Sequence, residues 1–314
     1  MRPELGRVIQ EIEKAIVGKR AVIEKTVMAL LAEGHVLLDD VPGVGKTTLA
    51  VALGRSMALK SQRIQFTPDV LPSDIVGFSV YDRNTGAFSY RPGALSGANL
   101  VLGDEINRAS SKTQSALLEA MEERQVTVDG TTYPLPRPFM VIATQNSVGT
   151  AGTQLLPYAQ MDRFMMRLSV GYPDYEAQMA MLRDRQTENP MDRVEPVLNC
   201  ETLLRLQQEA RSVTVRDSVL DYITRLTMAS RENGLVEVGV SPRGALFLDR
   251  MARARAFLEG RDYVTGSDVR AVFHDVCAHR VIPSRKARTA GVSAAQILDG
   301  LLEAVPNPDR GNGR

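Results

Sequence analysis

The segment from Leu37 to Thr48 constrains the fold of this chain more than any other feature. An apolar run at its start leads into the glycine-rich turn Pro42-Gly43-Val44-Gly45, and Lys46-Thr47-Thr48 then open a helix. Glycines let the backbone wrap closely around an anion so that successive N–H groups point inward, and the helix adds its positive dipole end. The segment therefore predicts a strand, a loop and a helix that together bind a nucleotide phosphate.

Within this segment, Lys46 is expected to reach the β- and γ-phosphates, and Thr47 to offer its hydroxyl to a magnesium ion. One position departs from the general pattern G-x-x-x-x-G-K-[ST], because Asp40 stands where the first glycine is expected. The alternative is an ordinary strand-turn-helix with a surface lysine. The coincidence of strand, Gly-x-Gly-Lys-Thr and helix favours the phosphate site.

The composition bounds the class of protein. The 314 residues are 44% hydrophobic and carry a formal net charge of +1, which indicates a globular chain long enough for two domains. Balanced charges argue against a general affinity for nucleic acids or membrane surfaces. Cys200 and Cys277 are isolated, as expected of buried thiols in a reducing compartment, and no apolar run reaches membrane-spanning length. We therefore expect a cytoplasmic protein without a membrane span.

The order of predicted elements indicates an α/β domain followed by helices. Short apolar strands are expected at 35–39, 63–66, 99–102, 139–143 and 168–170. They alternate with helices, which is typical of a parallel sheet buried on both faces. Two hairpins are expected, at 78–91 and 126–133, and the Asp129-Gly130 turn of the second predicts type I′ geometry. We expect an α/β domain over 1–190, an all-helical domain over 191–306 and a disordered tail over 307–314.

Two acids follow the predicted strand 99–102. Ligands of open α/β sheets bind at the carboxyl ends of the strands, which is where Asp104 and Glu105 stand. Asp104 is expected to hold the magnesium ion, and Glu105 to orient and polarise an attacking water. The alternative for such a pair is a solvated or helix-capping role, but the phosphate loop earlier in the chain favours the catalytic one.

The next predicted strand, 139–143, ends in Thr144-Gln145-Asn146. A polar side chain at that position would lie beside the γ-phosphate or the attacking water, and Asn146 is the candidate. The competing interpretation is an asparagine that only forms a turn.

Two arginines complete the candidate set. Arg163 is placed where it would reach the nucleotide of a neighbouring subunit. The alternatives are an ion pair with Asp162 or an ordinary surface arginine. Ser241-Pro242-Arg243 are predicted to be the N-cap and first two residues of a helix. A cation in the first turn opposes the helix dipole, which suggests that Arg243 serves an anion, such as the γ-phosphate under a folded-over helical domain.

Together these segments resemble the MoxR family of AAA+ ATPases. The likeness extends over nearly the whole chain, to about Pro306. The segments that carry it, in chain order, are Val41–Thr48 (Walker A), Asp104–Ala109 (Walker B and the residues after it), Ala143–Asn146 (sensor 1), Ala159–Phe164 (arginine finger) and Ser241–Arg243 (sensor 2).

The resemblance implies a AAA+ phosphate-loop domain with a parallel five-stranded sheet, followed by a small all-helical lid. It implies a hexameric ring with ATP and Mg²⁺ at the subunit interfaces, Arg163 acting in trans, and Val17 and Gly18 beside the adenine. It also implies ATP hydrolysis coupled to chaperone-like remodelling or metal-cofactor maturation of a partner protein, often one with a von Willebrand factor A domain. The residues then expected to bind ATP are Val17, Gly18, Pro42, Gly43, Val44, Gly45, Lys46, Thr47, Thr48 and Arg243.

The family pattern is not matched everywhere. Gln154-Leu155-Leu156 stand where Tyr-Pro-Leu is expected, and Tyr158 replaces an expected acid. Two other functions stay open: a nucleotide-gated adaptor with slow turnover, and a DNA-associated motor. The tips of the predicted hairpins, Asn84-Thr85-Gly86 and Asp129-Gly130, are not basic, which argues against the DNA motor.

Overall fold

The computed structural model describes residues 1–84, 86–146, 156–184, 186 and 188–309. At its centre lies a five-stranded sheet with the strand order β2-β5-β8-β1-β9. The strands are β1 (Val36–Asp39), β2 (Ser61–Gln65), β5 (Leu100–Asp104), β8 (Met140–Gln145) and β9 (Met166–Leu168). Neighbouring strands are parallel in every pair, which confirms the predicted α/β class.

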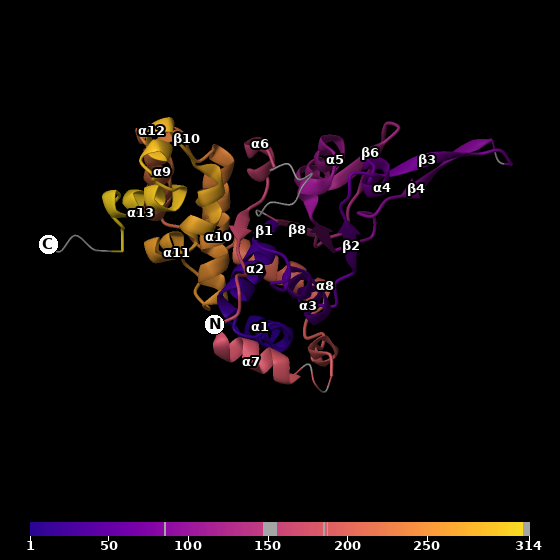
Figure 1. Cartoon of the computed structure of the whole chain (residues 1–314), viewed down its shortest axis with the longest axis horizontal. Coiled ribbons are helices and arrows are strands. Elements are labelled where there is room, and N and C mark those ends of the chain that lie inside the picture. Colours follow the sequence, from indigo (N-terminus) through magenta and orange to yellow (C-terminus); the bar gives the residue numbers. More distant parts are fainter. Residues whose placement is uncertain (85, 147–155, 185, 187, 310–314) are drawn as a thin grey trace.

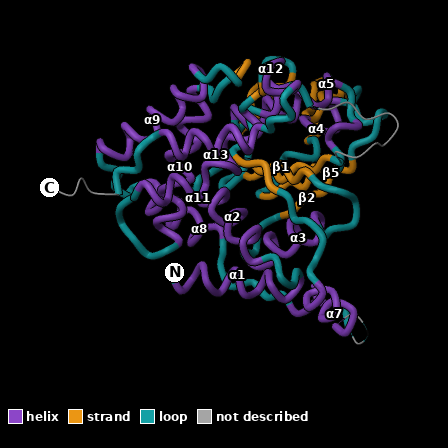
Figure 2. Tube along the Cα trace, turned by 60° about the vertical axis from the view of Figure 1, so that its left-hand side comes forward, coloured by secondary structure: helices purple, strands orange, loops and turns teal. Residues whose placement is uncertain are grey.

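Helices cover both faces of this sheet (Figure 2). Its inner strands β1, β5 and β8 are accordingly short and mostly buried, whereas the edge strand β2 is polar and exposed except at Ile64. Side chains alternate along β5: Leu100 and Leu102 join the apolar cluster with α1, α2 and α3, whereas Val101 joins the cluster with α5. The helices of this part are α1 (Pro3–Ala15), α2 (Arg20–Leu31), α3 (Lys46–Ser56), α4 (Pro72–Val76) and α5 (Ser111–Glu123), with a 3₁₀ turn at Ile106–Arg108.

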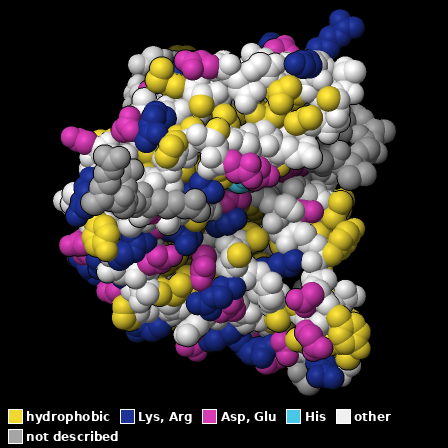
Figure 3. Space-filling model, turned by 90° about the vertical axis from the view of Figure 1, so that its left-hand side faces the viewer, with side chains coloured by type: hydrophobic (Ala, Val, Ile, Leu, Met, Phe, Trp, Pro, Cys, Tyr) yellow, Lys and Arg dark blue, Asp and Glu magenta, His cyan; other side chains and the backbone are white. Residues whose placement is uncertain are grey.

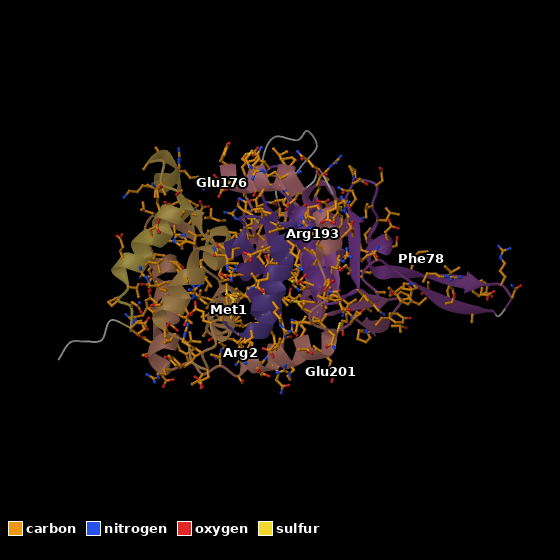
Figure 4. All side chains as sticks on the ribbon, turned by 90° about the horizontal axis from the view of Figure 1, so that it is seen from below. Met1, Arg2, Phe78, Glu176, Arg193 and Glu201 are labelled. Atoms are coloured by element: carbon orange, nitrogen blue, oxygen red, sulfur yellow. The ribbon has the colours of Figure 1, made fainter. Side chains whose placement is uncertain are left out.

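Two antiparallel hairpins extend from the sheet domain. They pair β3 (Gly77–Asp82) with β4 (Ala87–Pro92), and β6 (Gln125–Val128) with β7 (Thr131–Pro134). Asp129 and Gly130 have φ angles of 48° and 76°, as the predicted type I′ turn requires. The first hairpin projects away from the body (Figure 1), and Phe78 lies on it (Figure 4). Near its base, the rings of Tyr90 and Tyr133 stack 3.9 Å apart, so the two hairpins touch.

The chain beyond the last strand of the large sheet is mainly helical. One unexpected element is a small antiparallel sheet of β10 (Val236–Val238) and β11 (Ile282–Pro283). A short helix, α6 (Tyr158–Met161), lies just before β9. The helices after β9 are α7 (Tyr175–Asp184), α8 (Cys200–Arg211), α9 (Asp217–Glu232), α10 (Pro242–Leu258), α11 (Gly266–Cys277), α12 (Arg285–Thr289) and α13 (Ala294–Ala304). Two 3₁₀ turns lie at Pro190–Arg193 and Ala278–Arg280.

The helical region packs directly on the sheet domain. Helix α10 contacts α2, and α11 contacts β9. A single apolar cluster accordingly contains Leu38 of β1 and Ile23 of α2 together with Met251 of α10 and Val272 of α11. The helical region and the sheet domain therefore share one core.

The surface and the C-terminal end bear on two of the sequence-based expectations. Acidic and basic side chains are interspersed on the face seen in Figure 3, in keeping with the net charge near zero. Asp309 accepts hydrogen bonds from the backbone N–H of Gly266 (2.8 Å) and Ser267 (2.6 Å), at the start of α11. Residues 310–314 of the predicted tail lie outside the described part. Within that part, no helix is both long and apolar enough to cross a membrane.

Candidate functional site

The predicted phosphate loop connects β1 to α3 and ends where α3 begins, at Lys46. Gly43 and Gly45 have φ angles of 84° and 96°, a region that side-chain-bearing residues rarely adopt. A Cβ added at either glycine would meet nothing within 4 Å, so the backbone conformation and not the available space requires glycine. Both glycines thus border open space just before α3 begins, which gives an anion room at the start of that helix.

Lys46 is buried at the centre of the site, with 7% of its surface exposed. Its Nζ donates to the carbonyl of Asp40 (2.8 Å) and to Asn146 Oδ1 (2.7 Å). Burial lowers the pKa of Lys46, while Asp40, Asp104, Asp39 and Glu105 oppose that effect. The ammonium is therefore held among oxygen atoms at the place where the sequence predicts a phosphate.

The two acids lie at the carboxyl end of β5, as predicted. Asp104 accepts from the Thr144 hydroxyl (2.7 Å) and from Arg63 (2.8 Å). Glu105 accepts from Asn146 Nδ2 (2.8 Å) and from Arg108 (2.9 Å). Glu105 also has a φ of 56°, a strained conformation for a residue with a side chain. The strand end thus turns sharply and directs two neighbouring carboxylates to separate partners.

These residues line one cavity of about 400 Å³, the phosphate-loop cavity. Apolar side chains such as Ile16, Ala177 and Met181 line part of its wall. Gly18 packs beside the cavity with a φ of 74°, and a Cβ there would lie 2.8 Å from the Cβ of Ala177. The predicted residues that line the cavity are Val17, Pro42, Gly43, Val44, Gly45, Lys46, Thr47, Thr48, Asp104, Glu105 and Asn146.

Asp40, which departs from the general loop pattern, anchors the loop to the neighbouring strand. Its carboxylate accepts from the N–H of Gly171 (2.6 Å), the hydroxyl of Ser169 (2.8 Å) and the N–H of Val41 (2.8 Å). Burial acts to raise the pKa of Asp40, but these hydrogen bonds outweigh it and the pKa is lowered. The acid therefore ties the start of the loop to the residues just after β9.

The two predicted arginines lie elsewhere. Arg163 and Arg243 line a second cavity of about 460 Å³, the arginine cavity, and neither lines the phosphate-loop cavity among the described residues. Arg163 Nε lies 3.1 Å from Glu122 Oε2, and Arg243 binds the other oxygen of the same carboxylate. Ser241 caps α10 as expected, its hydroxyl accepting from the N–H of Gly244 at 3.0 Å. Within one chain, Arg243 therefore faces Glu122 and not the phosphate loop.

The sequence did not reveal the contacts of three residues of these sites. Glu122 is one acid of several on α5, and only its contact with both arginines distinguishes it. Asp162 does not pair with Arg163 as considered, but with Arg280 (2.8 Å). Thr144, two residues before the predicted Asn146, donates to Asp104 and also accepts from the N–H of Glu105 (2.9 Å). Thr144 alone carried a usable signal, because it stands at the same strand end as Asn146.

The unusual Tyr158 also has a defined place. Its hydroxyl donates to the carbonyl of Arg280 (3.1 Å) and lies 3.4 Å from the carbonyl of Gly239, and burial raises the pKa of Tyr158. The tyrosine therefore attaches α6 to the helical region. Gln154 and Leu155, the other departure, lie outside the described residues.

The chain matches two models of protein families. Residues 35–166 match the ATPase family associated with various cellular activities (AAA), and residues 228–301 match the AAA lid domain. A crystal structure of a Cytophaga hutchinsonii protein assigned as an ATPase superposes with a TM-score of 0.89 at 39% identity, over 97% of this chain and 94% of the other.

Relatives that match over nearly the whole of this chain identify the particular family within the AAA ATPases. The chain is 45% identical to the uncharacterized protein YeaC of Bacillus subtilis, over 98% of this chain and 96% of the relative. It is 38% identical to chaperone MoxR1 of Mycobacterium tuberculosis (97% and 82%) and 32% identical to protein MoxR of Methylorubrum extorquens (98% and 96%). This chain therefore belongs to the MoxR family of AAA+ ATPases.

Proposed function

We propose that this ATPase binds ATP and Mg²⁺ in the phosphate-loop cavity and hydrolyses the γ-phosphate there. The observation that carries the proposal is that Lys46, Glu105 and Asn146, from three separate segments, are joined by hydrogen bonds around one cavity. Its apolar wall, which includes Val17, suits an adenine, and the open glycine loop suits the phosphates.

The residues also fit the proposed metal. The Thr47 hydroxyl and the Asp104 carboxylate are hard oxygen donors on the wall of the same cavity, as Mg²⁺ prefers. When bound, the ion would neutralise charge on the β- and γ-phosphate oxygens. Glu105 would then polarise the attacking water, a role typically worth ~10²–10⁴ in rate, while Lys46 and Asn146 would hold the γ-phosphate.

We further propose that Arg163 and Arg243 act on the nucleotide of a neighbouring subunit. Both arginines line a cavity separate from their own phosphate loop, which leaves them available to a second copy of the chain. An arginine supplied in trans contributes ~10³–10⁵ in rate to related nucleotide hydrolases. A closed cyclic assembly, such as a hexameric ring, would give every site such a neighbour.

The work of the cycle is proposed to be chaperone-like remodelling, or metal-cofactor maturation, of a partner protein in the cytoplasm. A relative that matches over nearly the full chain is named as a chaperone, which supports this output. Strand β8, which ends just before Asn146, follows the β6–β7 hairpin in the chain, and Tyr133 of that hairpin stacks on Tyr90 of the projecting one. A partner with a von Willebrand factor A domain is a candidate client.

Mixing two inactive variants tests the arrangement in trans. Lys46→Ala subunits lack the phosphate-binding lysine but supply arginines, and Arg163→Ala subunits do the reverse. Each variant alone should lose roughly 10³-fold in steady-state ATPase rate. An equimolar mixture should recover roughly a quarter of the wild-type rate, because half of the sites are intact and half of their neighbours supply an arginine. A mixture no more active than its components would refute the proposal.

A pull-down with Glu105→Gln in ATP tests the remodelling role. This variant should bind ATP without hydrolysing it and should retain its client, with Lys46→Ala as the control that binds no nucleotide. Recovery of the same proteins with both variants would contradict a nucleotide-dependent client. A client that is retained but does not accelerate the slow ATPase of the wild type would instead indicate the nucleotide-gated adaptor.

A further inference from the structure

The segment that carries Arg163 is tied to the helical region through one carboxylate. Asp162 lies between α6 and β9 and is mostly buried, with 13% of its side chain exposed. Its Oδ1 accepts from Arg280 Nε at 2.8 Å, and the hydroxyl of Ser241 lies 3.0 Å from each of its two oxygens. Asp162 thus contacts two residues that are distant from it in the chain.

Arg280 supplies most of this attachment. Its side chain has 0% exposure, and it reaches the segment from the 3₁₀ turn after α11. A buried guanidinium is tolerated only when its donors are satisfied. Arg280 Nη2 donates to the carbonyls of Asp162 (2.8 Å) and Phe164 (2.6 Å), the residues on either side of Arg163. One buried cation therefore holds the backbone directly before and after Arg163.

Ser241 extends the same network to Arg243. As the N-cap of α10, its hydroxyl accepts a hydrogen bond from the N–H of Gly244 (3.0 Å). The same hydroxyl donates a hydrogen bond to Asp162. Arg243 is the second residue of that helix, and its Nη1 lies 3.9 Å from Asp162 Oδ2. The start of α10, and with it Arg243, is therefore fixed relative to Asp162.

The two guanidinium groups meet at a second carboxylate. Glu122 at the end of α5 binds Arg163 with one oxygen and Arg243 with the other. The backbones of the two arginines are thus joined through Asp162, Arg280 and Ser241, and their charged ends are joined through Glu122.

We propose that Asp162 and Arg280 are positioning residues that present Arg163 and Arg243 to a neighbouring subunit as one pre-assembled pair. This inference rests on the proposed role of the two arginines in trans. Two cations on separate, mobile elements would repel each other and would each lose conformational freedom on meeting a phosphate. Holding both in place beforehand removes that cost from the catalytic step. The network is long-range, joining α6, α10 and α11, so it belongs to the folded subunit and not to any one element.

The decisive experiment places Asp162→Asn on one side of the subunit interface at a time. In the first mixture, Asp162→Asn is added to the Lys46→Ala subunit, which only donates arginines. In the second, it is added to the Arg163→Ala subunit, which only supplies the phosphate loop. The first mixture should lose at least tenfold in recovered ATPase rate. The second should recover as much as the mixture without Asp162→Asn.

Equal losses of ATPase rate in both mixtures, or no loss in the first, would overturn the inference. A general loss of structure would lower the rate whichever of the two subunits carries Asp162→Asn. Failure of the parent mixture of Lys46→Ala and Arg163→Ala would instead refute the proposed function in trans. The two failures are therefore distinguishable.

Matched variants separate positioning from stability. Asp268→Asn removes another buried carboxylate, which pairs with Arg261 at 2.6 Å in the helical region, and should lower the Tm without changing kcat well below it. Ser241→Ala and Ser293→Ala each remove a helix N-cap, of α10 and α13, but only Ser241 touches Asp162. Ser241→Ala should lower kcat severalfold with an unchanged KM for ATP, and Ser293→Ala should not.

Non-additivity gives a further readout that does not require mixing. Adding Asp162→Asn to the double variant Arg163→Ala/Arg243→Ala should lower kcat no further than the double variant alone, because neither positioned arginine is then present. Multiplicative losses, or a kcat for Ser293→Ala as low as that for Ser241→Ala, would contradict the inference.

Discussion

Lys46 Nζ and Asn146 Oδ1 are in direct contact at 2.7 Å, so the lysine proposed to bind phosphate is held by the side chain that follows the neighbouring strand. Through its Nδ2, Asn146 also donates to Glu105 Oε1 at 2.8 Å. One amide thus links the proposed phosphate ligand to the proposed base, and it does so with both of its polar ends. An alanine cannot replace either contact.

We expect Asn146→Ala to reduce kcat on the order of 10²-fold, because Glu105 loses the donor that orients it. The KM for ATP should change far less, since the loop N–H groups remain. Steady-state kinetics at saturating ATP measure both. Asn99→Ala is the matched control, because Asn99 is also buried but donates to the carbonyl of Pro138 (2.9 Å), away from the cavity. Equal kcat losses in the two variants would argue against the role given to Asn146.

At Glu105 we expect the carboxylate to be needed for ATP hydrolysis, while the strained backbone conformation of this residue lowers the stability of the fold. Glu105→Ala and Glu105→Gly both remove the carboxylate, but only glycine adopts a φ of 56° without strain. We expect the glycine variant to unfold at higher urea than the alanine variant, with a free energy of unfolding greater by about 1 kcal/mol. At the exposed helical position Glu119 the order should reverse, again by about 1 kcal/mol. Alanine being the more stable at both positions would contradict the strain.

The stability of the fold should fall in mild acid. Burial lowers the pKa of His35 from 6.5 to about 4, and burial also lowers the pKa of His279. Between pH 6.5 and 4, the unfolded chain therefore binds a proton at His35 that the folded chain does not. The free energy of unfolding should decrease as the pH falls through this window, by about 3 kcal/mol for His35 when fully developed.

Urea unfolding at pH 7 and pH 5 measures this dependence. His35→Gln should reduce the pH dependence of the free energy of unfolding. An unchanged dependence in His35→Gln would show that other groups cause the acid loss.

The Tyr90–Tyr133 stack should hold the projecting hairpin against the second one. An aromatic pair contributes about 0.5–1.5 kcal/mol beyond its buried area, so Tyr133→Ala should speed amide hydrogen exchange in β3 and β4 roughly two- to tenfold. Tyr81→Ala is the comparison, because Tyr81 packs on Phe88 within the hairpin itself, at a ring distance of 5.3 Å. Faster exchange near Tyr90 in Tyr81→Ala alone would contradict a coupling between hairpins.

The sequence identified the main residues of the phosphate-loop cavity because Glu105 and Asn146 directly follow β5 and β8, and Lys46 follows β1 after the glycine-rich loop. Parallel strands end at the same edge of a sheet, so Lys46, Glu105 and Asn146 needed only the strand order to meet. The strand predicted at 168–170 lies two residues earlier in the structure, at Met166–Leu168. Apolar residues occur both before and after Leu168, so the sequence does not mark where the strand ends. Strands β10 and β11 were too short to show any period.

The partners of the arginines had no such signal. Arg243 meets Glu122, and Arg280 meets Asp162, across 121 and 118 residues of chain. Charged residues occur throughout α5 and α10, and nothing in their spacing selects one pair. Only the packing of the helical region against the sheet domain decides which of them touch.

That shared packing determines where a subunit of this kind can bend. Tilting α10 and α11 away from α2 and β9 would expose side chains such as Met251 and Val272, which are fully buried, at about 25 cal/mol for each Å² of apolar surface. The subunit should therefore respond to nucleotide as a nearly rigid block. In the proposed ring, movement would then be concentrated at the boundaries between subunits and in the hairpin that projects beyond the shared core. The chain should melt in a single cooperative step.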